Sequence, residues 1–158
     1  MSEEKTSFVY VTYIRSTPEK VFDAITKPEI ARRYWAHENV SDWNAGSDWQ
    51  HVRNNEQHTV DIVGKVVEVD APTRLVITWA SPAQAADPKS YSRVTFEVVP
   101  YEGMVRLTVT HDELEAGSGM AQGIRQGWPI VLSSLKSLLE TGQGIDVFAK
   151  PQTAQATI

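Results

Sequence analysis

The clearest pattern of hydrophobic positions lies near the C-terminus. Apolar side chains recur at helical spacing, in the order i, i+4, i+7, i+8, i+11, i+14 and i+15, at Ile124, Trp128, Val131, Leu132, Leu135, Leu138 and Leu139. This spacing predicts one long helix with a single apolar stripe. Ser118 is suited to cap its start and Gly142 to end it, and Pro129 predicts a kink near residues 127–129 because proline removes a backbone hydrogen bond.

The N-terminal segment has a different pattern. Residues 7–14 are rich in β-branched and aromatic side chains on both faces, which predicts a strand covered on two sides. Two short helices are expected to follow, each led by a proline, at Pro18 and at Pro28. The second helix would turn Tyr34 and Trp35 inward.

From residue 38 onward the apolar positions alternate with a period of two, which predicts a series of strands. Gly64 within one of them predicts a bulge or a tight bend of a curved sheet. Residues 81–90 are rich in proline and alanine without periodicity and predict a long loop. The turns between the other segments are short, which implies antiparallel pairing. The predicted strands cover residues 38–43, 47–53, 58–69, 75–79, 93–98 and 105–111.

These elements predict an α+β fold, in which a curved antiparallel sheet of about six to seven strands wraps around the long C-terminal helix. Two short helices follow the first strand. We expect one domain over residues 1–142. Residues 143–158 are rich in glutamine, alanine and threonine and are expected to form a flexible tail.

Composition narrows the classes of function. The 158 residues carry 15 basic and 20 acidic side chains, a net charge of -5, which argues against nucleic acid as a partner. The absence of cysteine excludes disulfides, thiolate metal ligands and a cysteine nucleophile. No apolar run is long enough for membrane insertion, and residues 1–7 do not look like a secretory signal, so we expect a cytoplasmic protein.

The order of elements and several short motifs resemble the START/Bet v 1-like (SRPBCC) superfamily of helix-grip proteins. More closely, the chain is similar to stand-alone bacterial proteins that resemble the C-terminal domain of the activator of Hsp90 ATPase. The resemblance spans residues 8–142. The motifs that carry it are Ile14, Ser16, Pro18, Val21 and Phe22; Gly64, Val66, Glu68, Pro72, Arg74 and Leu75, ending at Thr78 and Trp79; residues 92–97; residues 107–111; and Gly127, Trp128 and residues 132–142.

The resemblance implies a hydrophobic cavity between the sheet and the long helix. Relatives of this kind bind lipids, hormones or polyketides, and some catalyse cyclisation. The relative that activates Hsp90 has a separate N-terminal domain, for which a chain of this length has no room. The resemblance therefore favours a ligand-binding role over a chaperone role, although fold alone does not decide function.

Five tryptophans are an unusual number for a domain of this size. Large aromatic rings dominate both cores and ligand cavities, so both interpretations stay open for them. Alternation along the predicted strands adds inward-facing aliphatic residues. The candidate ligand-binding residues are Trp35, Trp49, His51, Val60, Ile62, Ile77, Trp79, Phe96, Leu107, Val109, His111, Trp128 and Leu132.

His111 faces inward by its alternation with Leu107 and Val109. It is either a core histidine satisfied by a neighbouring hydroxyl, or a polar group in the cavity, or a general base tuned by burial. His51 has the same alternatives. The four histidines match no metal-binding spacing, so we expect no metal. The glycine-rich residues 117–123 lack the dinucleotide motif and are better interpreted as a flexible entrance loop, so no cofactor is expected.

Three hypotheses follow. The first is a module that binds a small hydrophobic or aromatic molecule, with His111 or His51 orienting the molecule's polar end. The second is an enzyme of the cyclase or hydratase kind that uses His111 as its base. The third is a cofactor of an Hsp90 homologue in the stress response. Monomer and homodimer are equally compatible with the sequence.

Overall fold

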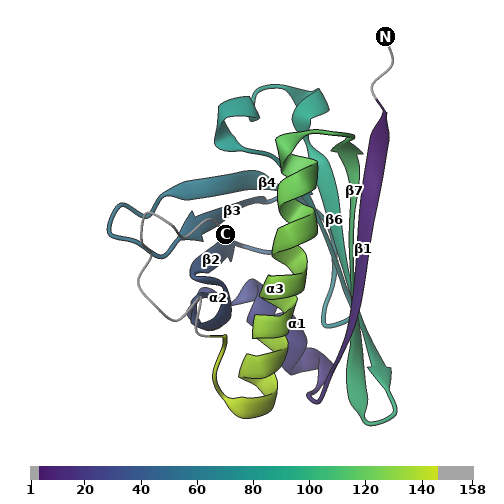
Figure 1. Ribbon diagram of the computed structural model, residues 1–158. Helices are drawn as coiled ribbons and strands as arrows, with labels where there is room; N and C mark the ends of the chain where they lie inside the picture. Colours follow the sequence, from purple (N-terminus) through teal and green to yellow (C-terminus); the bar gives the residue numbers. More distant parts are fainter. Residues whose placement is uncertain (1–3, 146–158) are drawn as a thin grey trace.

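The computed structural model describes residues 4–145 as one curved antiparallel sheet gripping a long helix (Figure 1). Seven strands pair in the order β1-β7-β6-β5-β4-β3-β2. The predicted α+β class and the wrapped sheet are confirmed. The strands are β1 (Lys5–Ile14), β2 (His37–Ser41), β3 (Asp48–Arg53), β4 (Val60–Asp70), β5 (Arg74–Trp79), β6 (Ser92–Tyr101) and β7 (Met104–Glu115).

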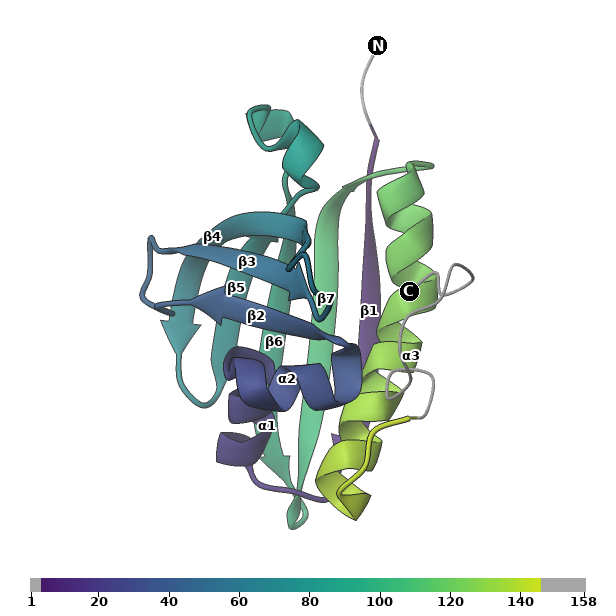
Figure 2. The same cartoon turned by 90° about the vertical axis from the view of Figure 1, so that its left-hand side faces the viewer.

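Two short helices connect β1 to β2. Helix α1 (Pro18–Thr26) begins at a proline, and the side chain of Thr17 accepts the Lys20 backbone N–H at 3.3 Å. Helix α2 (Pro28–Trp35) also begins at a proline, as predicted from the preference of proline for the first helical position. Figure 2 shows both helices at one end of the sheet, opposite the loop between β5 and β6.

Helix α3 (Gly119–Thr141) packs its apolar stripe against the concave face of the sheet. Both predicted caps are present. Ser118 accepts the Ala121 backbone N–H at 3.0 Å, and Gly142 ends the helix with a φ of 91°, a left-handed conformation that glycine adopts without strain. The helix is continuous through Pro129.

The bend predicted at Gly64 lies in strand β4, where Gly64 pairs with Trp49 of β3 and lies next to Thr78 of β5. The indole Nε1 of Trp49 crosses β4 here and donates to the Thr78 carbonyl at 2.7 Å, while the Lys65 backbone N–H donates to the Thr78 hydroxyl at 2.8 Å. A Cβ on Gly64 would overlap the Thr78 carbonyl oxygen and lie 2.6 Å from Nε1 of Trp49. Glycine is needed at this position because the Trp49 ring passes so close to the backbone.

Three segments differ in detail from the sequence-based expectation. The strand over residues 7–14 was expected to be covered on two sides, but Val9, Val11 and Tyr13 on its outer face are exposed, because no layer of the described chain packs on that face of the sheet. The loop predicted over residues 81–90 contains two single-turn 3-10 helices, η1 (Pro82–Gln84) and η2 (Pro88–Ser90). Residues 143–145, predicted as the start of the tail, pack against α3, where the Ile145 backbone N–H donates to the buried Ser134 hydroxyl at 3.0 Å. The rest of the predicted tail lies outside the described residues.

Candidate functional site

The space between the sheet and α3 holds a cluster of eight aromatic rings, called the aromatic cluster below. Neighbouring rings of the cluster have their centroids 4.2 to 6.2 Å apart. Four of the rings are tryptophans that come from four different elements, α2, β3, β5 and α3, and all four are at most 7% exposed. The members are Trp35, His37, Trp49, His51, Trp79, Phe96, His111 and Trp128.

The structure brings the sequence-predicted site residues together around this cluster. The aliphatic members Ile62, Ile77, Leu107, Val109 and Leu132 are buried beside it, and only Val60 is partly exposed. The predicted rings pack against one another.

A chain of hydrogen bonds fixes the proton positions of His111. The Trp128 indole N–H donates to Nδ1 of His111 at 3.1 Å, so Nδ1 carries a lone pair and Nε2 carries the proton. Nε2 lies 2.8 Å from the Ser92 hydroxyl, which donates in turn to the Trp79 carbonyl at 3.0 Å. Burial lowers the pKa of His111 to about 4.

His111 therefore has the geometry of a core histidine satisfied by a neighbouring hydroxyl. Both of its ring nitrogens are occupied, and the ring is fully buried. A general base needs a free lone pair within hydrogen-bond reach of the substrate. The arrangement around His111 leaves no such lone pair.

His51 is held differently. The side-chain amide of Asn39 donates to the Ile25 carbonyl at 2.8 Å, which turns its oxygen toward Nδ1 of His51 at 2.7 Å. An amide oxygen only accepts, so Nδ1 of His51 carries the proton. Burial, with the nearby His37 as a second cause, lowers the pKa of His51 well below its usual value, so the ring stays neutral.

His37 lies directly behind His51 and connects it to the carboxylate of Asp61. The His37 ring stacks on the His51 ring with a centroid distance of 4.2 Å and an interplanar angle of 3°. Its Nε2 lies 2.8 Å from the Asp61 carboxylate, which also accepts two hydrogen bonds from Arg53 at 2.8 and 3.0 Å. Burial opposes ionisation of Asp61, but the hydrogen bonds from Arg53 and His37 outweigh it and lower the pKa of the carboxyl group.

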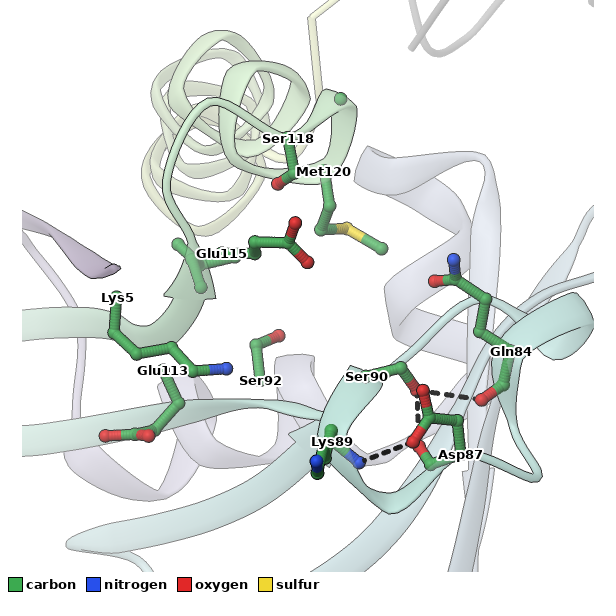
Figure 3. A pocket seen from close by; sticks show the side chains of 12 residues that line it. Lys5, Gln84, Asp87, Lys89, Ser90, Ser92, Glu113, Glu115, Ser118 and Met120 are labelled. Carbon is green, nitrogen blue, oxygen red and sulfur yellow. Dashed lines mark hydrogen bonds between the residues drawn. The ribbon is translucent and has the colours of Figure 1, made fainter. Parts of the chain in front are cut away.

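A pocket of about 330 Å³ opens at the end of the sheet away from α1 and α2. It lies between the loop joining β5 to β6, the end of β7 and the start of α3. Figure 3 shows the side chains of Glu115 and Met120 pointing into it. Polar side chains dominate the lining, which consists of Lys5, Gln84, Asp87, Lys89, Ser90, Ser92, Glu113, Leu114, Glu115, Ser118, Gly119 and Met120.

The pocket touches the aromatic cluster through two of its lining residues. The Trp79 indole N–H donates to the sulfur of Met120 at 3.3 Å. Ser92, only 4% exposed, is the hydroxyl partner of His111 described above. Met120 and Ser92 therefore form the boundary between an open polar pocket and the buried rings.

Sequence reasoning missed this pocket, since none of its lining residues was among the candidates. Two signals pointed toward it. The predicted entrance loop over residues 117–123 contains Ser118, Gly119 and Met120, although helix α3 already begins at Gly119. Ser92 is the cross-strand partner of Trp79, which places a hydroxyl beside a candidate ring.

Residues 4–145 contain no group of three or more His, Cys, Asp or Glu side chains placed to hold a metal ion. No helix within this range is long and apolar enough to cross a membrane.

The curved sheet, the gripped helix and the two short connecting helices define the helix-grip class of the START-related superfamily. Residues 15–140 match the family described as "Activator of Hsp90 ATPase homolog 1-like protein". This match covers most of the chain, so the protein belongs to that family. A comparison with curated proteins gave no match.

Solved structures with the same fold include the Aha1 dimer from Colwellia psychrerythraea, which is 20% identical with a TM-score of 0.73 and covers 88% of this chain and 99% of its own. Protein MLL2253 from Mesorhizobium loti is 24% identical with a TM-score of 0.71, covering 85% and 97%. An Hsp90 activator from Plasmodium falciparum, PFC0360w, is 22% identical with a TM-score of 0.64, covering 77% and 86%. At these identities the likeness concerns the fold.

Proposed function

We propose that the protein binds a small apolar or aromatic molecule between the sheet and α3, and that the molecule enters from the pocket by displacing Met120. The observation that carries the proposal is the contact between the Met120 sulfur in the pocket wall and the Trp79 indole N–H in the aromatic cluster. Of the two boundary residues, Met120 is the one that contacts a tryptophan ring with its side chain.

The chemistry of this boundary suits a movable barrier. Methionine is unbranched, has three rotatable side-chain bonds and packs adaptably against aromatic rings. Its thioether is a weak hydrogen-bond acceptor, so moving it away from Trp79 gives up little. The pocket volume of about 330 Å³ lies at the lower end of the range for small-molecule sites.

The wall of the pocket carries charged side chains. These are the basic residues Lys5 and Lys89 and the acidic residues Asp87, Glu113 and Glu115. These charged groups stay in contact with water at the entrance. The rings of the ligand would replace Met120 beside Trp79.

A thermal-shift screen of metabolites and lipids tests the proposal. A ligand at a hundredfold excess over its Kd adds about 2.7 kcal/mol to the free energy of unfolding. For a domain of this size that corresponds to a rise in Tm of about 5 to 11 °C. A screen in which no compound stabilises the protein contradicts the proposal.

A pair of methionine variants locates the site. Met120→Trp fills the boundary with a large ring and should abolish the stabilisation by any compound found in the screen. Met104→Trp is the matched control, because Met104 begins β7 whereas the pocket lies at the other end of that strand. Equal stabilisation of wild type and Met120→Trp contradicts the proposed entrance.

A second candidate function is activation of an Hsp90 ATPase, which the family description suggests. The observation that favours it is an exposed aromatic pair on the outer face of the sheet, where Tyr13 and Tyr101 have ring centroids 5.2 Å apart and Arg106 lies 5.7 Å over the Tyr101 ring. Aromatic and arginine side chains of this kind are common at protein interfaces.

An ATPase assay with the Hsp90 homologue of the host separates this candidate from ligand binding. Stimulation that Tyr101→Ser abolishes, with compound binding unchanged, would support activation through the outer face. No stimulation by the wild-type protein would exclude it.

A further inference from the structure

The hydrogen bonds inside the aromatic cluster leave one histidine nitrogen unused. His111 uses both ring nitrogens, and so does His37, whose Nδ1 lies 3.1 Å from the Trp35 carbonyl and whose Nε2 lies against Asp61. His51 uses only Nδ1, which donates to Asn39. Its Nε2 has a free lone pair and no hydrogen-bond partner among residues 4–145.

This nitrogen is buried but not sealed. His51 as a whole is only 4% exposed. Within the described part of the chain, every side-chain nitrogen or oxygen that is shut off from solvent has a hydrogen-bond partner. Nε2 of His51 has no such partner among these residues and is not one of the atoms shut off from solvent. A donor group on a bound molecule can take the place of water at this acceptor.

The surroundings of His51 are aromatic. Its ring centroid lies 4.6 Å from that of Trp35, 5.8 Å from that of Trp79 and 6.1 Å from that of Trp49. Trp79 is also the ring that contacts Met120 at the pocket boundary. A molecule that displaces Met120 would lie beside Trp79, whose ring is a direct neighbour of the His51 ring.

We propose that Nε2 of His51 accepts a hydrogen bond from the bound molecule, so that the ligand class is neutral aromatic or alicyclic compounds carrying a hydroxyl or N–H group. This inference rests on the proposed function and deepens it. A ketone, ether or carboxylate presents only lone pairs to the His51 lone pair and is selected against. His51 acts as a specificity determinant, and His111 does not contact the ligand's polar atom.

Two probes of nearly equal shape test the inference. 2-Naphthol carries a hydroxyl donor, and 2-methoxynaphthalene has the same ring system without a donor. Titrations followed by calorimetry should show 2-naphthol binding to the wild-type protein about tenfold more tightly, the ratio expected for one buried hydrogen bond. In His51→Phe the two probes should bind equally.

The ¹⁵N spectrum of the imidazole groups gives a readout that does not depend on the variant folding. The Nε2 resonance of His51 should have the position of an unprotonated nitrogen and should shift when 2-naphthol is added, and not with 2-methoxynaphthalene. Equal affinities of the two probes for wild type would overturn the inference and leave the proposed function standing. Failure of both probes to bind, with no stabiliser in the wider screen, would remove the proposed function itself.

Discussion

The indole N–H of Trp128 on the long helix donates to Nδ1 of His111 on strand β7 at 3.1 Å. This contact sets the tautomer of His111 and thereby the direction of the hydrogen bonds through Ser92 to the Trp79 carbonyl. The chain joins α3, β7, β6 and β5. It makes His111 a structural element of the interior, and this distinguishes it from His51.

Stability should depend on pH through His111. The folded protein holds the pKa of His111 at about 4, whereas the unfolded chain has the ordinary value of 6.5. Between pH 6.5 and 4 the unfolded state takes up a proton that the folded state does not, so the free energy of unfolding falls as the pH falls. The contribution of His111 to the free energy of unfolding is fully present above pH 6.5, and about 3 kcal/mol of stability is lost near pH 4. Urea denaturation at a series of pH values measures this loss.

The variant His111→Gln separates this effect from other groups. Glutamine does not titrate, so the slope of the free energy of unfolding against pH in this window should decrease by the equivalent of about one proton. His51, whose pKa is also lowered, contributes in the same direction and remains in the variant. An unchanged slope would contradict the assignment to His111.

Ser92→Ala should destabilise the protein. It removes the acceptor of the His111 Nε2 proton and leaves a buried N–H without a partner, which costs about 1–3 kcal/mol. Ser133→Ala is the matched control, because Ser133 is exposed on α3. The free energy of unfolding in urea should fall for the first variant and stay level or rise slightly for the second. Equal values would show that the chain through Ser92 does not stabilise the fold.

Gly64→Ala should disturb the position of Trp49. A Cβ there overlaps the Thr78 carbonyl oxygen and crowds the Trp49 indole, so the ring must leave its hydrogen bond to Thr78. Overpacking of this kind costs about 1–3 kcal/mol. Gly123→Ala, on α3 with open space around its Cα, should instead stabilise the helix by about 0.5–1 kcal/mol. Thermal unfolding compares the two, and near-ultraviolet circular dichroism reports the Trp49 environment.

Asp61→Asn should weaken the fold around His51. The carboxylate accepts hydrogen bonds from Arg53 and His37. A hydrogen bond to a charged group contributes about 1.5–3 kcal/mol to the free energy of unfolding, which is lost when the bond is broken. Asp48→Asn is the control, because its pair with Lys65 is mostly exposed and should contribute nothing measurable. A loss of stability in the control as large as that in Asp61→Asn would argue against a special role for this group.

The sequence predicted those features that repeat along the chain. The stripe on α3 and the caps at Ser118 and Gly142 follow from helical spacing and local chemistry, and both are present. The inward direction of His111 followed from strand alternation, and its burial agrees. Gly64 marked the bend of the sheet because glycine inside a strand signals close approach.

Other features could not be read from the sequence because they join distant segments. The hydrogen bond from Trp128 to His111 and that from Trp79 to Met120 depend on side-chain conformations set by the packed interior. The pocket forms where an aperiodic loop meets the start of α3, and its lining residues have no common pattern. The difference between His51 and His111 depends on the orientation of the Asn39 amide, which only the fold determines.

The most direct test of the account follows the five tryptophan indole N–H groups by ¹H–¹⁵N NMR while 2-naphthol is added. Three of them have assigned partners, Trp49 with Thr78, Trp79 with Met120 and Trp128 with His111. Displacement of Met120 by the ligand removes the partner of Trp79, so its signal should shift most, followed by that of Trp128.

Trp43 is the internal control, because it is partly exposed and lies outside the aromatic cluster. The account predicts a saturable shift of the Trp79 signal with that of Trp43 unmoved. A titration in which the Trp79 and Trp128 signals stay in place, or in which only Trp43 responds, would contradict ligand binding between the sheet and the long helix.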